Sequence, residues 1–209
     1  MKQEELNEIV ENHVKWLYGN GGKPANLMRA DLHGADLSGA NLKCARLYKA
    51  DLRLANLRDT YLYDADLTEA NLHGVDLSKA NLTKASLYQA DLSNANLSEA
   101  ILSEADLRET NLSGTDLSDT NLSGADLPTG MYQIVGPGSY NRCTTYDSVN
   151  DQVVCGCWDD KKGNHLDSFI IRVERIYGPN GKRPDPLFYA EYMAAIDFFK
   201  AMKKLNKRT

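Results

Sequence analysis

The sequence has 209 residues, of which 42% are hydrophobic and 25% are charged, and its formal net charge is −5. This length accommodates one domain or two, and four cysteines are too few for a disulfide-stapled scaffold. No apolar run approaches the roughly 18 residues that a membrane-spanning helix needs, and no secretory signal precedes the first charged segment. These features predict a cytoplasmic protein with free thiols.

Residues 1–24 begin with a predicted amphipathic helix over residues 2–18. Its apolar side chains share one stripe: Leu6, Ile9, Val10, Val14 and Leu17. Several glycines and then Pro24 end the helix. A repeat segment starts directly afterwards, and an exposed solenoid end needs a cap. We therefore expect this helix to cap the repeats, with Trp16 and Leu17 covering the layer that contains Leu27.

Residues 25–129 contain a strict five-residue repeat. Leucine occupies every fifth position from Leu27 to Leu127, twenty-one times, and a small residue stands two positions before each. Asp or Asn stands directly before the Leu in seventeen of these repeats. Neither an α-helix nor a plain strand has a side-chain period of five. A short fixed period instead indicates a solenoid, in which each repeat packs on its neighbours.

The pattern A(D/N)LXX resembles the pentapeptide-repeat family. This resemblance implies a β-solenoid, a right-handed quadrilateral β-helix with four repeats per coil, in which the Leu and the small residue point inward. Twenty-one repeats then form about five coils and one extra side. Residues twenty apart are expected to stack in columns. Asp and Asn are expected at the corners, because their side chains hydrogen-bond to turn backbone.

We name the four sides faces one to four, and their first leucines are Leu27, Leu32, Leu37 and Leu42. The residue before Leu departs from Asp or Asn on only two adjacent sides. Face one carries Arg46 and Ser86, and face four carries Tyr61 and Ile101.

Tyrosines also follow the Leu on these two faces. Tyr48 and Tyr88 belong to face one and Tyr63 to face four, so the tyrosines are predicted to share the edge between the two faces. Three interpretations stay open: aromatic ladders that stabilise the sheet, a partner-binding patch, or a surface covered by residues 130–209. The candidate partner-binding residues are Arg46, Tyr48, Tyr61, Tyr63, Tyr88 and Ile101.

The C-terminal coils are acidic, since residues 91–127 contain eight acidic and one basic residue. The acidic end is formed mainly by Glu99, Glu104, Asp106, Glu109, Asp116 and Asp119. Some members of the family that the repeats resemble imitate DNA toward gyrase. A duplex carries one negative charge per ~1.7 Å along its whole axis, whereas residues 26–60 are net basic. Because the rod is acidic over less than half its height, it is a poor copy of a duplex.

Residues 130–209 predict a small α+β domain. Short strands are expected in MYQIV (131–135), RCTTYDSV and QVVCGCW, and helices over residues 166–177 and near the C-terminus. This segment resembles a small C-terminal domain of tailed-phage and gut-bacterial proteins. That resemblance implies no activity that can be assigned to particular residues.

The same segment contains four candidate metal ligands: Cys143, Cys155, Cys157 and His165. Cys155 and Cys157 would share one face of a strand, but zinc sites usually separate paired cysteines by two to four residues. Buried free cysteines are the commoner outcome. A Cys–His nucleophile would also lack an evident orienting group. We therefore predict no cofactor and no catalytic residues, and the metal question stays open.

Taken together, these features predict a non-enzymatic interaction scaffold with a protein partner and without direct nucleic-acid or membrane binding. A homodimer is left open. The phage resemblance adds the hypothesis of phage or prophage origin, with a role in counter-defence or host takeover. Two alternatives remain: a DNA-mimic inhibitor of a DNA-binding enzyme such as gyrase, and a small enzyme within residues 130–209.

Overall fold

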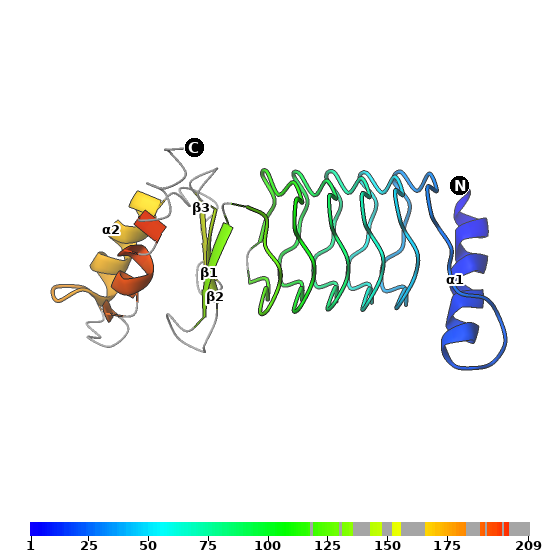
Figure 1. Cartoon of the computed structure of the whole chain (residues 1–209), viewed down its shortest axis with the longest axis horizontal. Helices are drawn as coiled ribbons and strands as arrows, with labels where there is room; N and C mark the ends of the chain where they lie inside the picture. The colour runs from blue at the N-terminus through cyan, green and yellow to red at the C-terminus, as the bar shows by residue number, and fades with distance from the viewer. Residues whose placement is uncertain are drawn as a thin grey trace. The chain divides into compact units, whose positions relative to one another are not determined.

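The computed structural model describes residues 1–117, 119–129, 131–135, 143–147, 152–155, 166–182, 189–190, 192–197 and 199–200. The chain divides into two compact units, Met1–Pro128 and Thr129–Thr209. The first contains helix α1 (Gln3–Leu17) and the repeats (Figure 1). The second contains strands and a helix: β1 (Met131–Val135), β2 (Cys143–Asp147), β3 (Gln152–Cys155) and α2 (Leu166–Tyr177).

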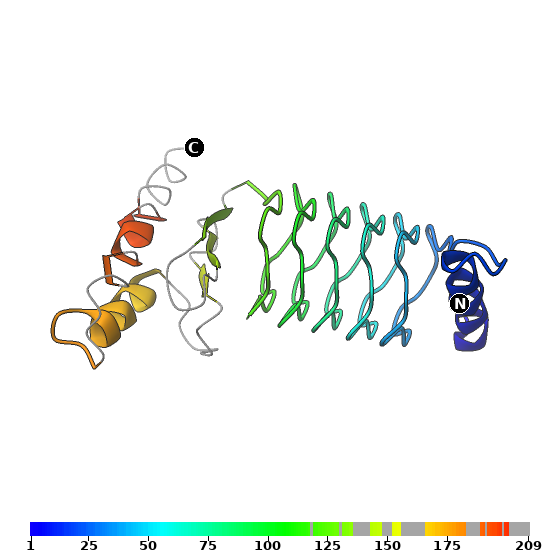
Figure 2. The same cartoon turned by 90° about the horizontal axis from the view of Figure 1, so that it is seen from below.

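The repeats form stacked coils of twenty residues (Figure 2). Seventeen parallel bridges join residues twenty apart, from Asn26↔Arg46 to Asp106↔Asp126. Each bridge is closed by two backbone bonds: for example, Leu27 N–H donates to Arg46 O at 2.8 Å and Arg46 N–H donates to Ala25 O at 3.0 Å. This arrangement confirms the prediction that residues twenty apart stack in columns.

Each coil turns four times, and each turn begins at a Leu. Ala30 N–H donates to Leu27 O at 3.1 Å, and the third residue of that turn, Arg29, has a φ of 58°. Only glycine adopts this left-handed conformation without steric cost. At Arg29 the turn is supported by a bond to the next coil, from Arg29 N–H to Tyr48 O at 2.8 Å. The corners therefore lie one and two residues after each Leu.

The prediction that Asp and Asn form the corners is wrong in position. They lie on the bridges, before the Leu, and their side chains reach forward to the turn. Asp31 Oδ1, for example, accepts a bond from His33 N–H at 3.2 Å, and Asp36 Oδ1 accepts one from Ser38 N–H at 3.1 Å. The expected bond to turn backbone is thus present, but it comes from the preceding flat side.

The interior is lined by the leucines and by the small residues before them, and those of the central coils are fully buried. Where threonine replaces the small alanine, its hydroxyl also finds a partner. Thr60 Oγ1 donates to Leu37 O at 3.0 Å, and three further threonines donate at 2.7 Å to the leucine carbonyl twenty-three residues earlier: Thr110, Thr115 and Thr120. The narrow core therefore holds these polar groups with their hydrogen bonds made.

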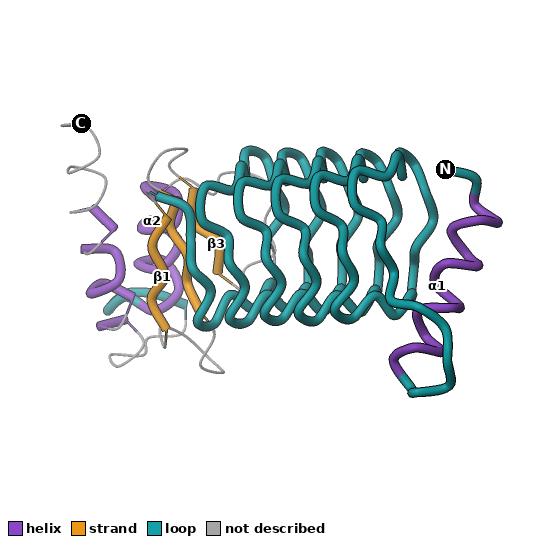
Figure 3. The backbone as a smooth tube through the Cα atoms, turned by 45° about the vertical axis from the view of Figure 1, so that its right-hand side comes forward, coloured by secondary structure: helices purple, strands orange, loops and turns teal. Residues whose placement is uncertain are grey.

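Helix α1 lies against the first coil (Figure 3). Leu6 and His13 are its fully buried side chains, while the other residues of the predicted apolar stripe are half-buried. The expectation that Trp16 covers the Leu27 layer is wrong, because Trp16 is 41% exposed and stacks on the His13 ring, with centroids 5.5 Å apart. His13 takes the inward position instead.

In the second unit, β1, β2 and β3 form an antiparallel sheet in that order, with Tyr132 opposite Tyr146 and Tyr146 opposite Val153. Helix α2 has the same bounds as the helix predicted over residues 166–177. Further helical segments lie at residues 189–190, 192–197 and 199–200. The buried side chains described in this unit all come from helical segments: Val173, Tyr192, Ala195, Ile196 and Phe199.

Candidate interaction surface

Face four differs from the other three sides in the charge of its bridge column. Consecutive bridges join its outward residues: Asn41, Tyr61, Asn81, Ile101 and Asn121. None of these five side chains is charged, whereas the corresponding columns of faces one, two and three all contain Asp. Tyr61 is 56% exposed and Ile101 is 40% exposed. Asn81 bridges to both, which places the two apolar side chains two coils apart on one flat surface.

The predicted single tyrosine edge is not present. Tyr48 lies in the turn closed by the bond from Ala50 N–H to Leu47 O, which joins face one to face two, and Tyr88 lies in the equivalent turn two coils later. Tyr63 lies in the turn closed by the bond from Ala65 N–H to Leu62 O, which joins face four to face one. The turn tyrosines therefore flank face one on both of its edges.

The turn tyrosines contact neighbouring coils. Tyr48 Oη donates to Glu69 Oε1 at 2.9 Å, and Lys49 Nζ lies 5.1 Å from the Tyr48 ring centroid and 3.0 Å from Glu69. Lys49 and then Tyr48, through their hydrogen bonds, lower the pKa of Glu69. Tyr63 lies under two amines, those of Lys43 at 4.9 Å and Lys84 at 6.0 Å. These cation–π and hydrogen-bond contacts link successive coils.

Tyr88 repeats this arrangement two coils higher. The Arg108 guanidinium lies 5.8 Å from its ring centroid, and a hydrogen bond with Glu109 is the main reason that the pKa of Tyr88 is raised. Tyr48, Tyr63 and Tyr88 are all half-buried. Arg46, in contrast, is exposed and makes no ion pair or side-chain hydrogen bond with any described residue. The six candidate residues thus separate into three that project and three that contact the rod itself.

The predicted acidic end surrounds the rod and does not form one stripe. Asp106 and Asp116 lie on the bridge columns of two different faces. The other carboxylates occupy left-handed turn positions: Glu99, Glu104, Glu109 and Asp119. Exposed ion pairs engage Glu99 with Lys79 at 3.8 Å and Glu104 with Lys84 at 3.5 Å. Glu109 accepts a bond from Gln89 at 2.6 Å. Several of these charges are therefore partly compensated.

Two places in the rod stack one aspartate directly on another. At Asp31↔Asp51, Arg53 forms two bonds to Asp51, from Nε at 2.8 Å and from a terminal nitrogen at 2.6 Å. These bonds are the main cause of the lowered pKa of Asp51. The other place has the same arrangement: Asp106, Asp126 and Arg108. An arginine two residues after one aspartate thus accompanies each like-charged stack.

The candidate metal ligands can be placed only in part. Cys143 begins β2 and Cys155 ends β3, and Cys155 is opposite Thr144 in the register. Cys157 and His165 lie outside the described residues. Among the residues that the structure does describe, no three His, Cys, Asp or Glu side chains are grouped to hold a metal ion. Metal binding by these four residues is therefore not tested by the described part of the chain.

Helices long and apolar enough to cross a membrane are absent from the described part of the chain.

The coil geometry and the sequence lead to the same family. The profile described as pentapeptide repeats matches residues 25–59, 60–98 and 90–127. The repeat region belongs to the pentapeptide-repeat family. Membership implies the right-handed quadrilateral β-helix expected from the repeats. No curated protein gives a match to the chain.

Solved structures are similar to part of the chain, and two of them, Rfr23 and HetL, are pentapeptide-repeat proteins. Rfr23 from the cyanobacterium Cyanothece 51142 is 36% identical over 44% of this chain and 64% of its own, with a TM-score of 0.44. HetL from Nostoc sp. PCC 7120, involved in heterocyst differentiation regulation, is 39% identical over 52% and 57%, with a TM-score of 0.25. QnrB1, a plasmid-mediated fluoroquinolone resistance protein, is 18% identical over 54% and 70%, with a TM-score of 0.23. The chain spans less than two thirds of the length of Rfr23 and of HetL.

Proposed function

We propose that this pentapeptide-repeat protein is a non-enzymatic interaction scaffold whose face four binds a protein partner. The observation that supports the proposal is the uncharged bridge column in which Tyr61 and Ile101 project. Charged residues are depleted at the centres of protein interfaces, where tyrosine and other aromatic residues are enriched. Face four has this composition, and the three faces with aspartate columns do not.

The margins of face four have the polar character of an interface rim. Lys79 lies in the turn before Asn81 and pairs with Glu99, while Lys84 lies in the turn after Asn81 and pairs with Glu104. Both pairs are exposed, so they contribute little to stability in the absence of a partner. They border the flat column on both sides. A rim of this kind favours orientation and rate of association more than affinity.

Rigidity also favours this use of the rod. From Tyr61 onward, each bridge residue of face four is held by two backbone bonds to the preceding coil, as for Tyr61 N–H to Ala40 O at 2.9 Å and Leu42 N–H to Tyr61 O at 2.8 Å. A partner would therefore meet a preformed surface and would not have to order a mobile loop. Preorganisation of this type lowers the entropic cost of binding.

The proposal is tested by returning both projecting side chains to the residue that the column otherwise uses. The double variant Tyr61→Asn, Ile101→Asn changes no turn residue and introduces the residue found at the other bridge positions of the column. We expect it to lose the partner that the wild-type protein captures from its source cells. With that partner purified, binding should weaken at least about tenfold, while the melting temperature stays unchanged.

The matched control is Leu54→Asn, because Leu54 is an exposed apolar side chain outside face four, 61% exposed, in a turn after face two. This variant should capture the partner as well as the wild type does. Retained binding by the double variant would contradict the proposal. Equal loss in the Leu54 variant would indicate general surface hydrophobicity and not face four.

We also propose that α1 caps the solenoid, because Leu6 and His13 are buried against the first coil. Phage or prophage origin, counter-defence, host takeover and a homodimer stay predictions. DNA mimicry stays an alternative that competition with DNA for gyrase at low salt would test. The partial compensation of the acidic end gives it no added support. The enzyme hypothesis depends on cysteines whose side chains lie outside the described residues.

A further inference from the structure

The lower edge of the first coil is an open β edge. We call the N-terminal neighbour of a coil the coil beneath it. In later coils, each bridge residue bonds to the coil beneath through both its amide and its carbonyl, as Arg46 does with Ala25 and Leu27. The first coil has no coil beneath it, so the same groups of its own bridge residues have no repeat to bond. Unpaired strand edges of this kind readily accept another extended chain.

Helix α1 supplies substitutes along part of this edge. The Gln3 side-chain amide donates to Asp36 O at 2.7 Å and accepts from Asp36 N–H at 3.1 Å, which reproduces the two bonds that a backbone would make. The Met1 amino group donates to Asp31 O at 2.8 Å. His13 bonds to Lys43 O and to Ala25 N–H, each at 3.0 Å.

At Asn26, the first bridge residue of face one, the edge stays open. Within the described part of the chain, neither Asn26 N–H nor Asn26 C=O has a hydrogen-bond partner. Asn26 is also one of the residues that line a cavity of about 540 Å³ between α1 and the first coil. The volume lies within the range of ligand pockets. The residue whose backbone N–H and C=O lack partners therefore lines a cavity large enough for a ligand.

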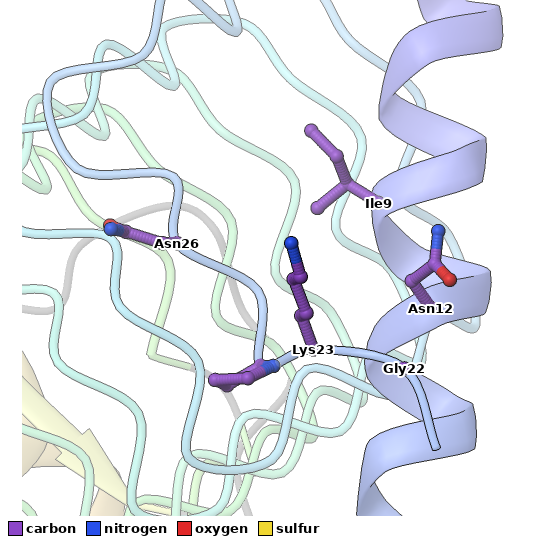
Figure 4. A pocket seen from close by; sticks show the side chains of 6 residues that line it. Ile9, Asn12, Gly22, Lys23 and Asn26 are labelled. Carbon is purple, nitrogen blue, oxygen red and sulfur yellow. The ribbon is translucent and has the colours of Figure 1, made fainter. Parts of the chain in front are cut away.

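The cavity has fixed walls. It is lined by Ile9 and Asn12 from α1, by Gly22, Lys23 and Pro24 from the return loop, and by Asn26 (Figure 4). The loop is held by a bond from Lys23 N–H to Asn12 O at 3.3 Å. Gly22 has a φ of 77°, and a side chain there would collide with the Asn12 carbonyl. The close approach of loop to helix thus preforms the groove.

The chemistry of the walls favours an anion with an apolar body. The Lys23 side chain points into the space between Ile9 and Asn26, and no described residue forms an ion pair with it (Figure 4). Ile9 and Pro24 offer apolar surface. A second cation, Arg46, is bridged directly to Asn26. Two acids of the helix, Glu8 and Glu11, are adjacent in sequence to Ile9 and Asn12, but neither is among the residues that line the cavity.

We propose that this groove binds the C-terminal end of an extended peptide. The peptide backbone pairs with Asn26 N–H and C=O, its terminal carboxylate lies at Lys23, and its last apolar side chain packs on Ile9 and Pro24. This site is separate from face four. It therefore stands or fails independently of the proposed function.

The test uses the full-length ¹⁵N-labelled protein and the peptide acetyl-Gly-Val-Leu with a free carboxylate. We expect saturable NMR shifts at the Asn26 and Lys23 amides, with a dissociation constant between about 0.1 and 1 mM. The same peptide with a C-terminal amide should bind about tenfold more weakly. Equal binding of the acid and the amide would refute the role of Lys23. Absence of shifts at Asn26 up to about ten times that concentration would overturn the proposal.

Variants make the assignment specific. Lys23→Met should remove the preference for the free acid, and Lys2→Met, an exposed lysine on the other end of α1, should keep it. If the preference survives in Lys23→Met, the carboxylate does not lie at Lys23 and the proposal is wrong. Shifts at Asn26 that depend on protein concentration without peptide would show that a second copy occupies the groove, which also contradicts it.

Discussion

Tyr48 and Tyr61 belong to adjacent sides of the rod, yet Tyr48 contacts the neighbouring coil and Tyr61 is mainly exposed to solvent. Tyr48 follows a Leu, lies in a turn, and bonds to Glu69 in the next coil. Tyr61 precedes a Leu, lies on a bridge, and is 56% exposed. A side chain on a bridge points away from the sheet. The turn side chain of Tyr48, in contrast, contacts the neighbouring coil. The position relative to Leu therefore decides whether an aromatic side chain stabilises the rod or projects from it.

The same division appears within α1. His13 is completely buried and bonds through both ring nitrogens, while its stacking partner Trp16 stays 41% exposed. Because Ala25 N–H donates to Nδ1, that nitrogen carries no proton, and Nε2–H must donate to Lys43 O. Only the neutral ring can make both bonds. The inward side chain is thus sensitive to pH, and the outward one is a convenient reporter.

The largest effect is expected from protonating His13. Burial lowers the pKa of His13 from its ordinary 6.5, opposed in part by the bond to Lys43 O. A lowered folded-state pKa means that the undocked state binds the proton more tightly. The stability that neutral His13 gives to the docking of α1 is therefore fully present above about pH 6.5 and is lost as the pH falls through the folded-state value. Trp16 fluorescence in a Trp158→Phe background should report this transition.

Two variants check the assignment to His13. His13→Gln should abolish the transition below pH 6.5. His33→Gln, which changes an exposed histidine in the turn after face two, should leave the transition in place. An unchanged transition in the His13 variant would assign the pH dependence to another group and would remove the support that His13 gives to the capping role of α1.

A smaller effect is expected from the two tyrosines. Tyr48→Ser removes a hydrogen bond to Glu69 and the contact with the Lys49 amine, so the melting temperature should fall by about 2–4 °C. Tyr61→Ser removes a side chain that contacts mainly solvent, and its melting temperature should stay within about 1 °C of wild type. Calorimetry on both variants compares them directly. A reversed order would show that position relative to Leu does not separate the two roles.

The sequence was sufficient to predict the stacked columns, because a strict five-residue period determines which side chains share a face. It also contained the signal for the corners, which the prediction of a tyrosine edge missed. Glycines with positive φ stand two residues after the Leu in five repeats: Gly34, Gly39, Gly74, Gly114 and Gly124. Glycine at one recurrent position indicates a left-handed turn. That signal places Tyr48 and Tyr63 on different edges.

The inward role of His13 had no such signal. The apolar stripe of α1 can be read from the sequence, but the groups that need hydrogen bonds at the helix interface belong to Ala25 and Lys43. These come from the repeats, and their position beside the helix depends on how the return loop closes. The open edge at Asn26 could not be predicted from the sequence for the same reason. It depends on which backbone groups of the first coil α1 leaves without a hydrogen bond.

The smallest effect concerns charge on the flat sides. Among the described residues, seventeen bridges stack side chains in columns, and only two of them place aspartate on aspartate. Each of these two stacks lies beside an arginine that forms two bonds to one carboxylate. At the upper stack, hydrogen bonds from Arg108 are the main reason that the pKa of Asp106 is lowered. Arg108→Gln should therefore raise the pKa of Asp106 and leave its repulsion with Asp126 unscreened. The loss of stability should be slight, because Arg108 and Asp126 are exposed and Asp106 is only half-buried, and it should shrink at high salt.

Arg58→Gln is the matched control for this prediction. Arg58 pairs with Asp59 at 3.3 Å, but the bridge residue of its repeat is Asn56, which stacks between Asp36 and Asp76, so no aspartate there lies on another. Its loss should change stability less than the loss of Arg108, and with a weaker dependence on salt. Carboxylate titration by NMR and melting at two salt concentrations distinguish the cases. Identical behaviour of the two variants would mean that surface arginines act on the rod only through its net charge, and that the pairing of arginine with stacked aspartates has no specific role.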